Sequence, residues 1–262
     1  MLTFSLQTGS NGNAVYVEAD GKRLLFDAGI SGRQAKLRMA AHGRCMHQLD
    51  ALIISHDHSD HVKHAGVFQR LFRVPIYCTE PTFQACRWRI GKVSHVNHFV
   101  AGQTLEFGPT VRVHTISTPH DAVDGVCFVV ESSAGRLGIF SDLGHPFLQL
   151  RAALESVDAA YLESNYDPQM LADGPYPQAT KDRIRGDGGH ISNHEAAGLL
   201  AGLGKRLQWA ALVHLSNDNN HPDVALKTHR DLLGDDYPLL ISTRYAVTDL
   251  LHCAREAERV VH

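Results

Sequence analysis

Five side chains that can bind a metal ion lie within six consecutive positions of this sequence. They are His56, Asp57, His58, Asp60 and His61. The cluster directly follows a short apolar run, which predicts a buried strand that ends at the cluster. Residues two apart point the same way at an extended strand end, so His56 and His58 can present two imidazoles to one cation while Asp57 points elsewhere.

The rest of the cluster suits a second cation. If a helix begins directly after His58, then Asp60 and His61 lie in its first turn and are displaced toward another ion. Imidazole and carboxylate together suit Zn²⁺, Mn²⁺ or Fe²⁺, whereas oxygen ligands alone would suggest Mg²⁺ or Ca²⁺. The alternative is a histidine-rich polar loop that binds no metal, because composition alone can mimic a site.

Further acids and histidines follow predicted strands elsewhere in the chain. Asp27 and Asp142 each close a predicted strand, His214 ends another, and His120 lies in a loop between two more. Taken singly, Asp27 could be a carboxylate that stabilises a turn, and Asp142 could be a helix N-cap. His114 is the alternative to His120 as the metal-binding histidine of this region. Placement of so many such groups at strand ends is hard to obtain by chance and favours one shared site.

Apolar periodicity and turn residues predict an alternation of strands and helices. The predicted extended segments are 2–7, 14–18, 23–27, 51–55, 75–78, 93–100, 111–116, 126–131, 136–142, 159–162 and 207–213. The predicted helices are 31–41, 61–72, 81–88, 149–156 and 196–203, another that begins near Pro222, and a last one in the tail after Tyr237, which also holds a short strand. The segment 166–189 is rich in proline and glycine and is predicted to be largely a loop.

Composition bounds the class of protein. The 262 residues with 44% hydrophobic content predict one globular domain over 1–262. A net charge of −3 provides no global positive field, so a polyanion would have to be bound locally. An odd number of cysteines without a CxxC pair, together with the lack of a signal-peptide pattern or a long apolar run, predicts a cytoplasmic protein.

The motif His-x-His-x-Asp-His after a hydrophobic strand, with Asp27 upstream, resembles the metallo-β-lactamase superfamily. Other stretches resemble its WalJ (YycJ) branch: Gly9-Ser10-Asn11-Gly12-Asn13, Ser141-Asp142-Leu143-Gly144-His145, Leu162-Glu163-Ser164-Asn165, Gly174-Pro175-Tyr176-Pro177, Gly188-Gly189-His190-Ile191-Ser192-Asn193 and His214-Leu215-Ser216. The resemblance covers essentially the whole chain. It implies an α/β metallo-β-lactamase fold, a four-layer αββα sandwich of two mixed β-sheets flanked by helices.

The resemblance also implies two divalent metal ions, for which Zn²⁺ and Mn²⁺ both fit. The implied ligands are His56, His58 and His120 for one cation, Asp60, His61 and His214 for the other, and Asp142 as a bridge. Asp27 is implied to lie beneath the metals and to form hydrogen bonds rather than bind metal. Two cations lower the pKa of a bridging water and clamp the oxygens of a phosphoryl group.

Residues beyond the ligands are expected to act on the substrate. Related phosphodiesterases use a histidine in the place of His190 to protonate the leaving oxygen, so His190 and Asp60 are the predicted catalytic residues. Arg183 and Arg185 are candidates for holding a phosphate, although they could equally lie on a solvated helix face. His145 is a candidate contact to the substrate or to the ligands.

The WalJ branch is associated with 5′-to-3′ DNA exonuclease activity, so the predicted function is a metal-dependent phosphodiesterase with DNA as its substrate. One alternative is a hydrolase of a small phosphodiester or thioester on the same metals, because this fold hosts many chemistries. Another is a regulatory binding protein with a degenerate site, which the intact ligand set argues against.

Overall fold

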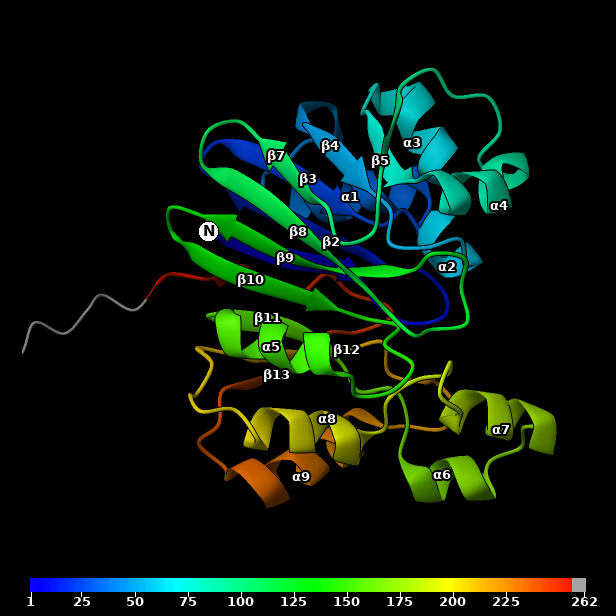
Figure 1. The fold of residues 1–262 in the computed structure, drawn as a ribbon, viewed down its shortest axis with the longest axis vertical. Helices are drawn as coiled ribbons and strands as arrows, with labels where there is room; N and C mark the ends of the chain where they lie inside the picture. Colours follow the sequence, from blue (N-terminus) through cyan, green and yellow to red (C-terminus); the bar gives the residue numbers. More distant parts are fainter. Residues whose placement is uncertain (256–262) are drawn as a thin grey trace, which may run out of the picture.

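The computed structural model describes residues 1–255, which form two seven-stranded β-sheets that face each other (Figure 1). The first sheet has the order β14-β1-β2-β3-β4-β5-β6, with β1 (Leu2–Gln7), β2 (Ala14–Ala19), β3 (Lys22–Phe26), β4 (Ala51–Ile53), β5 (Ile76–Thr79), β6 (Val96–Phe99) and β14 (Leu251–His252). The second has the order β13-β12-β11-β10-β9-β8-β7, with β7 (Thr104–Phe107), β8 (Val111–Ser117), β9 (Val126–Ser132), β10 (Gly135–Phe140), β11 (Ala159–Glu163), β12 (Ala210–Val213) and β13 (Leu239–Ile241). Both sheets mix parallel and antiparallel pairs, as predicted.

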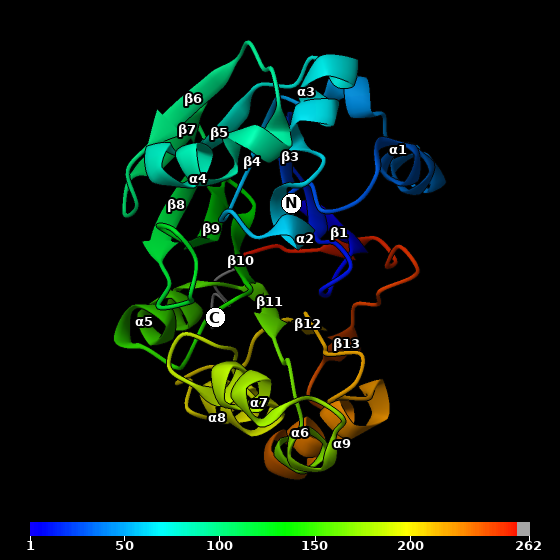
Figure 2. The ribbon, with the colours of Figure 1, turned by 90° about the vertical axis from the view of Figure 1, so that its right-hand side faces the viewer.

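Helices cover the outer face of each sheet. Those on the side of the first sheet are α1 (Gly32–Ala41), α3 (Ala65–Phe72) and α4 (Glu80–Ile90), and those on the side of the second are α5 (Leu148–Ser156), α6 (Pro168–Asp173), α7 (Gln178–Arg185), α8 (Asn193–Ala201) and α9 (Pro222–Leu233) (Figure 2). Two short elements complete the set, η1 (Met46–Gln48) and α2 (Ser59–Val62). The four-layer αββα arrangement is therefore confirmed.

The layers are held together by three large apolar cores. One lies between the sheets and includes Phe26 and Phe128, whose ring centroids are 5.0 Å apart. A second joins the first sheet to α1, α3 and α4, and a third joins the second sheet to α5 and α8. Burial of so much apolar surface on both faces of each sheet makes the sheets a rigid frame for the groups at their edge.

Strand direction brings distant residues to one edge of this frame. Strands β10, β11 and β12 are parallel neighbours, and β8 runs the same way because it is two antiparallel steps from β10. Carboxyl ends of parallel strands meet at the same edge, so the loops after these four strands converge. The loop after β4 of the first sheet reaches the same place.

The observed elements differ from the predicted ones in two segments and by one additional strand. The helix predicted at 61–72 is two helices, α2 and α3, because the loop after β3 intervenes: the amide of Ala28 donates to the His61 carbonyl at 2.6 Å, and the amide of His64 donates to the Ala28 carbonyl at 3.0 Å. The segment 166–189 contains α6 and α7, because proline is compatible with the first turn of α6 and with the residue before α7. Strand β7 was not predicted.

The tail after Tyr237 contains β13 and β14, and no helix is present among its described residues up to 255. The remaining part of the predicted final helix, 256–262, lies outside the described residues. Within residues 1–255, none of the helices combines the length and the apolar character needed to cross a membrane.

Candidate metal centre

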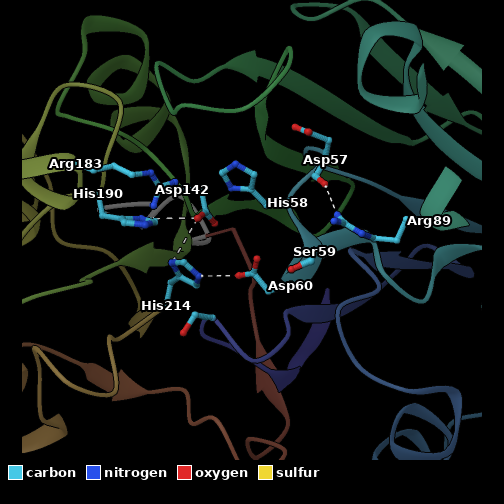
Figure 3. Close-up of a pocket in the computed structure, with 10 residues that line it drawn as sticks. Asp57, His58, Ser59, Asp60, Arg89, Asp142, Arg183, His190 and His214 are labelled. Carbon is cyan, nitrogen blue, oxygen red and sulfur yellow. Dashed lines mark hydrogen bonds and ion pairs between the residues drawn. The ribbon is translucent and has the colours of Figure 1, made fainter. Parts of the chain in front are cut away.

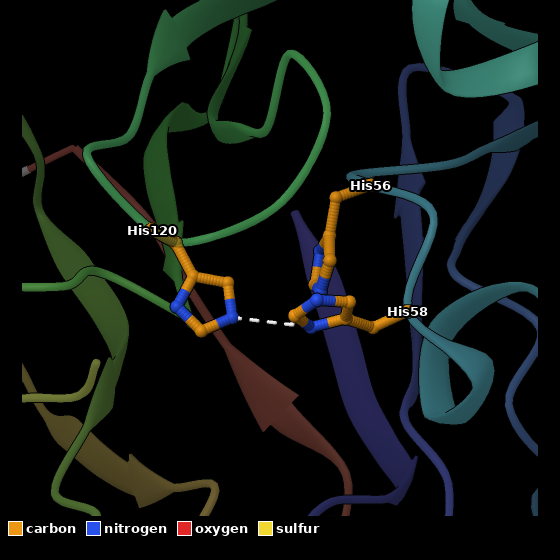
Figure 4. A group of neighbouring side chains, drawn as sticks. All are labelled: His56, His58 and His120. Atoms are coloured by element: carbon orange, nitrogen blue, oxygen red, sulfur yellow. Dashed lines mark hydrogen bonds between the residues drawn. The ribbon is translucent and has the colours of Figure 1, made fainter. Parts of the chain in front are cut away.

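Three histidines from two loops form the first ligand cluster. His56 and His58 follow β4, His120 follows β8, and their ring nitrogens lie within 4.8 Å of one another (Figure 4). His120 Nδ1 donates to the Gly189 carbonyl at 2.7 Å, which leaves Nε2 facing His58 Nδ1 at 3.2 Å. The buried Nε2 atom of His56 has no hydrogen-bond partner among the described residues.

This first cluster is suited to a cation in its charge state as well as its geometry. Burial, followed by the neighbouring His61, lowers the pKa of His56, and burial also lowers the pKa of His120. Both imidazoles are therefore neutral, which is the form that binds metal. The Nε2 atom of His56 is buried, belongs to a neutral ring and has no hydrogen-bond partner among the described residues, and it lies near two other imidazole nitrogens. Such an arrangement is suited to metal binding.

Asp60, His61 and His214 form the second cluster. The Oδ2 atom of Asp60 lies 3.4 Å from the Nε2 atom of each imidazole. Burial alone would lower the pKa of His214, but the negative charge of Asp142 and the hydrogen bond to Asp60 raise it to about 10. The pKa of His61 is raised likewise: burial opposes the shift, but the negative charges of Asp142 and Asp27 outweigh it. The raised pKa values show that these imidazoles lie in a buried site with excess negative charge. A bound cation can take the place of their protons and balance that charge.

Asp142 lies between the two clusters. Its Oδ2 is 3.1 Å from His61 Nε2, and its Oδ1 is 3.5 Å from His214 Nδ1 and 3.6 Å from His120 Nε2. Burial would raise the pKa of this carboxyl, but the positive charges of His214 and His61 hold it well below its usual range. One carboxylate thus contacts ligands of both clusters.

Asp27 orients His61 of the second cluster through hydrogen bonds. Its carboxylate accepts from the Ser55 amide at 2.8 Å and from His61 Nδ1 at 2.7 Å. These bonds turn the Nε2 atom of His61 toward Asp142, and the Asn13 amide nitrogen is 2.8 Å from the same atom. Carboxylates that orient a ligating histidine in this way are a recurrent feature of metal sites.

Three residues at the ends of the strands that carry the site have an unusual backbone conformation. Asp27, Asp142 and His214 have φ of 65°, 56° and 56°, the left-handed region that non-glycine residues seldom adopt. Each directly follows a strand or lies within two residues of its end. Strain kept at three such positions is typical of a functional site that the surrounding fold enforces.

Glu163 and His190 form a third group beside Asp142. Glu163 ends β11 and is wholly buried, and its Oε1 accepts from His190 Nδ1 at 2.6 Å while its Oε2 accepts from the Leu143 amide at 2.9 Å. Burial would raise the pKa of Glu163, but His190 and His214 lower it to about 2. Glu163 was not predicted as a site residue, although it ends the buried apolar strand β11.

A cavity of about 410 Å³ opens above the clusters (Figure 3). It is lined by Ser10, Asp57, His58, Ser59, Asp60, Arg89, Asp142, Arg183, His190 and His214. Four of the seven predicted metal ligands, His58, Asp60, Asp142 and His214, line this cavity together with the predicted acid His190. The other three, His56, His61 and His120, belong to the same clusters but are not part of the cavity wall. Arg89 was not predicted.

Of the three predicted substrate-binding residues, one lines the cavity and two do not. Arg183 is in the cavity wall, but its Nε and Nη2 donate to the two carboxylate oxygens of Asp121 at 2.5 and 2.8 Å. Arg185 pairs with Asp182 and is not part of the wall, and His145 donates from Nδ1 to the Asp187 carbonyl at 2.8 Å outside it. His114, the competitor of His120, lies within β8 and contacts Glu131 at 3.1 Å instead.

Residues 22–214 match the family described as the beta-lactamase superfamily domain. The chain belongs to this superfamily. It is 32% identical over 223 residues to exodeoxyribonuclease YycJ of Bacillus anthracis, with 84% of each chain covered. It is 34% identical over 228 residues to exodeoxyribonuclease WalJ of Streptococcus pneumoniae, with 85% of this chain and 84% of the relative covered. The resemblance to the WalJ (YycJ) branch is thereby confirmed, and the chain is an enzyme of the superfamily's hydrolase class.

Solved structures support the fold. The metallo-beta-lactamase fold protein YhfI from Bacillus subtilis superposes with a TM-score of 0.70 at 16% identity, covering 94% of this chain and 98% of its own. A diphosphatase of the PhnP family gives 0.66 at 16% identity, with 97% and 100% covered. At this identity the likeness establishes the fold alone, and the His and Asp clusters within it are suited to divalent metal ions.

Proposed function

We propose that this enzyme is a phosphodiesterase that degrades DNA stepwise from the 5′ end with two divalent cations. The observation that carries the proposal is the position of Asp142, which contacts ligands of two separate clusters at the floor of one open cavity. Two relatives that share about a third of the sequence are named exodeoxyribonucleases, which supports DNA as the substrate.

One cation would be held by His56, His58 and His120, and the other by Asp60, His61 and His214. Asp142 would contribute to both sites. Zn²⁺ and Mn²⁺ both suit these ligands. When bound, the two cations would lower the pKa of a water molecule, so that hydroxide is available near neutral pH, and would bind the oxygens of the phosphoryl group.

His190 would protonate the leaving oxygen. Its Nδ1 is engaged by Glu163, so Nε2 is the nitrogen free to face the cavity. Because the pKa of Glu163 is lowered to about 2, this carboxylate stays ionised and stabilises the protonated imidazole. A positioned acid of this kind contributes roughly 10²–10⁴-fold to a rate.

A second candidate is hydrolysis of a small phosphodiester or thioester on the same residues. The cavity volume of about 410 Å³ lies within the range of small-ligand sites, roughly 300–1,000 Å³, which favours this candidate enough to test it.

The deciding experiment uses protein reconstituted with Mn²⁺ or Zn²⁺ and end-labelled DNA oligomers, single- and double-stranded, with 5′-phosphate or 5′-hydroxyl ends. We expect stepwise loss of nucleotides from the 5′ end, abolished by Asp60→Ala and reduced about 10²-fold or more by His190→Ala. His114→Ala is the matched control, since His114 contacts Glu131 away from the cavity, and it should leave the rate unchanged. Absence of cleavage by protein that carries two metals per chain would overturn the proposal in favour of a small substrate.

A further inference from the structure

Two arginines stand on opposite sides of the cavity, and their charges are compensated differently (Figure 3). Arg183 on α7 is held by both carboxylate oxygens of Asp121. Arg89 on α4 donates from Nη1 to the backbone carbonyl of Asp57 at 3.2 Å and forms no ion pair with any described residue. Arg89 therefore brings an uncompensated positive charge to the cavity wall.

Trp88 lies beside this charge. Its side chain is 73% exposed, an unusual state for so large an aromatic group, whereas the other tryptophan, Trp209, is 8% exposed. The guanidinium carbon of Arg89 lies 4.6 Å from the indole ring centroid, so it covers one face of the ring. The high exposure of Trp88 leaves indole surface open for a planar group to stack, directly next to the cavity wall.

We propose that Trp88 and Arg89 form the subsite that grips the nucleic acid strand beside the scissile phosphate, with Arg89 binding a backbone phosphate and Trp88 stacking on a nucleobase. This inference rests on the proposed function and adds the residues that select a polynucleotide. Guanidinium and phosphate form strong charge-assisted hydrogen bonds, and every nucleobase presents a face that can stack on an indole. Because the net charge of the chain is −3, attraction of a polyanion has to come from such local cations.

The subsite has a defined place relative to the chemistry. His190 and Arg89 lie on opposite sides of the cavity, with Asp60 and Asp142 between them (Figure 3). If His190 protonates the leaving oxygen, Trp88 and Arg89 bind the part of the strand on the other side of the scissile phosphate. A substrate that lacks a nucleobase there loses the stacking contact but keeps the phosphate contact.

Fluorescence tests the contact without requiring catalysis. Full-length Asp60→Asn protein is titrated with a single-stranded DNA oligomer and with an abasic oligomer of the same length. Since Trp88 is the exposed one of the two tryptophans, we expect the base-containing oligomer to quench emission strongly and the abasic one weakly. Adding Trp88→Leu should remove the quenching and weaken binding about 10-fold. Quenching or affinity that persists in Trp88→Leu would overturn the inference.

Kinetics separates this inference from the proposed function. For DNA, Trp88→Leu and Arg89→Ala should raise KM about 10-fold with little change in kcat, and Trp88→Leu should abolish the preference for base-containing over abasic oligomers. Arg87→Ala is the matched control, because Arg87 is an exposed arginine on the same helix that does not line the cavity. Wild-type protein that leaves DNA intact would refute the proposed function itself, whereas normal DNA cleavage with an unchanged KM in both variants would refute only the subsite.

Discussion

The two β-sheets contribute to the candidate metal centre in different ways. The first sheet delivers His56 and His58 from the loop after β4, and Asp60 and His61 from the short helix α2 that follows at once. The second sheet delivers its groups one at a time, from loops after β8, β10 and β12 and from the last residue of β11. A contiguous motif can form by local geometry, whereas the dispersed groups meet only because their strands run in the same direction.

The charge of the contiguous motif depends on residues outside it. His56 has a lowered pKa, mainly because it is buried, whereas the pKa of His61 is raised despite burial by Asp142 and Asp27. The second sheet supplies Asp142, which contacts His61 of the first sheet and His214 of its own. The contiguous motif alone therefore does not set the charge of the centre.

The largest effect is expected from Asp142→Asn. Removal of this charge leaves both clusters without their shared carboxylate, so kcat/KM on DNA should fall by well over 100-fold, the upper range for groups that only orient ligands. Metal content, measured by elemental analysis of dialysed protein, should fall as well. The matched control is Asp57→Asn within the contiguous motif, because the Asp57 carboxylate accepts from the Val123 amide at 2.9 Å rather than contacting either cluster. Equal metal loss in both variants would show that contact with both clusters is not what makes Asp142 necessary for metal binding.

A smaller effect is expected from Glu163→Gln. Glutamine can still accept from the Leu143 amide, but it cannot stabilise positive charge on His190. We expect kcat to fall about 10- to 100-fold with KM unchanged and a shifted pH-rate profile. Glu195→Gln is the control, since Glu195 closes the capping box of α8, a role that glutamine also fills. A rise in KM with constant kcat would assign Glu163 to substrate binding instead.

The same contrast explains what the sequence could predict. The motif at 56–61 and the strand ends at Asp142 and His214 were visible because each group follows an apolar run. The αββα layering was predicted from family resemblance and is confirmed, but the positions of individual helices such as α6 and α7 were hidden by the surrounding prolines and glycines. Local patterns thus revealed the groups, and tertiary structure decided how they meet.

Contacts between residues far apart in the sequence decide the surroundings of the cavity, and local patterns did not reveal them. Arg183 appeared free in the sequence, yet it pairs with Asp121, 62 residues earlier. Arg89 appeared ordinary, yet α4 places it at the cavity wall. Glu163 needed the knowledge that β11 lies between β10 and β12, which no local pattern contains.

The smallest effect is expected at a histidine–carboxylate contact between strands β8 and β9 of the second sheet. Glu131 contacts His114 and Arg136 on a partly exposed surface. Burial would raise the pKa of Glu131, but the hydrogen bond from His114 and the charge of Arg136 lower it. A carboxyl group whose pKa is lowered by folding stabilises the protein above its unfolded-state pKa, and this stabilisation is lost as the pH falls through the folded-state pKa.

Glu131→Gln should therefore lower the free energy of unfolding at pH 7 by only about 0.5 kcal/mol, because solvent screens the pair, and by less near pH 4. Urea unfolding at both pH values measures this, and metal content and DNA cleavage should stay at wild-type levels. Loss of either would mean that a histidine–carboxylate pair within a strand supports the centre as strongly as one at a strand end.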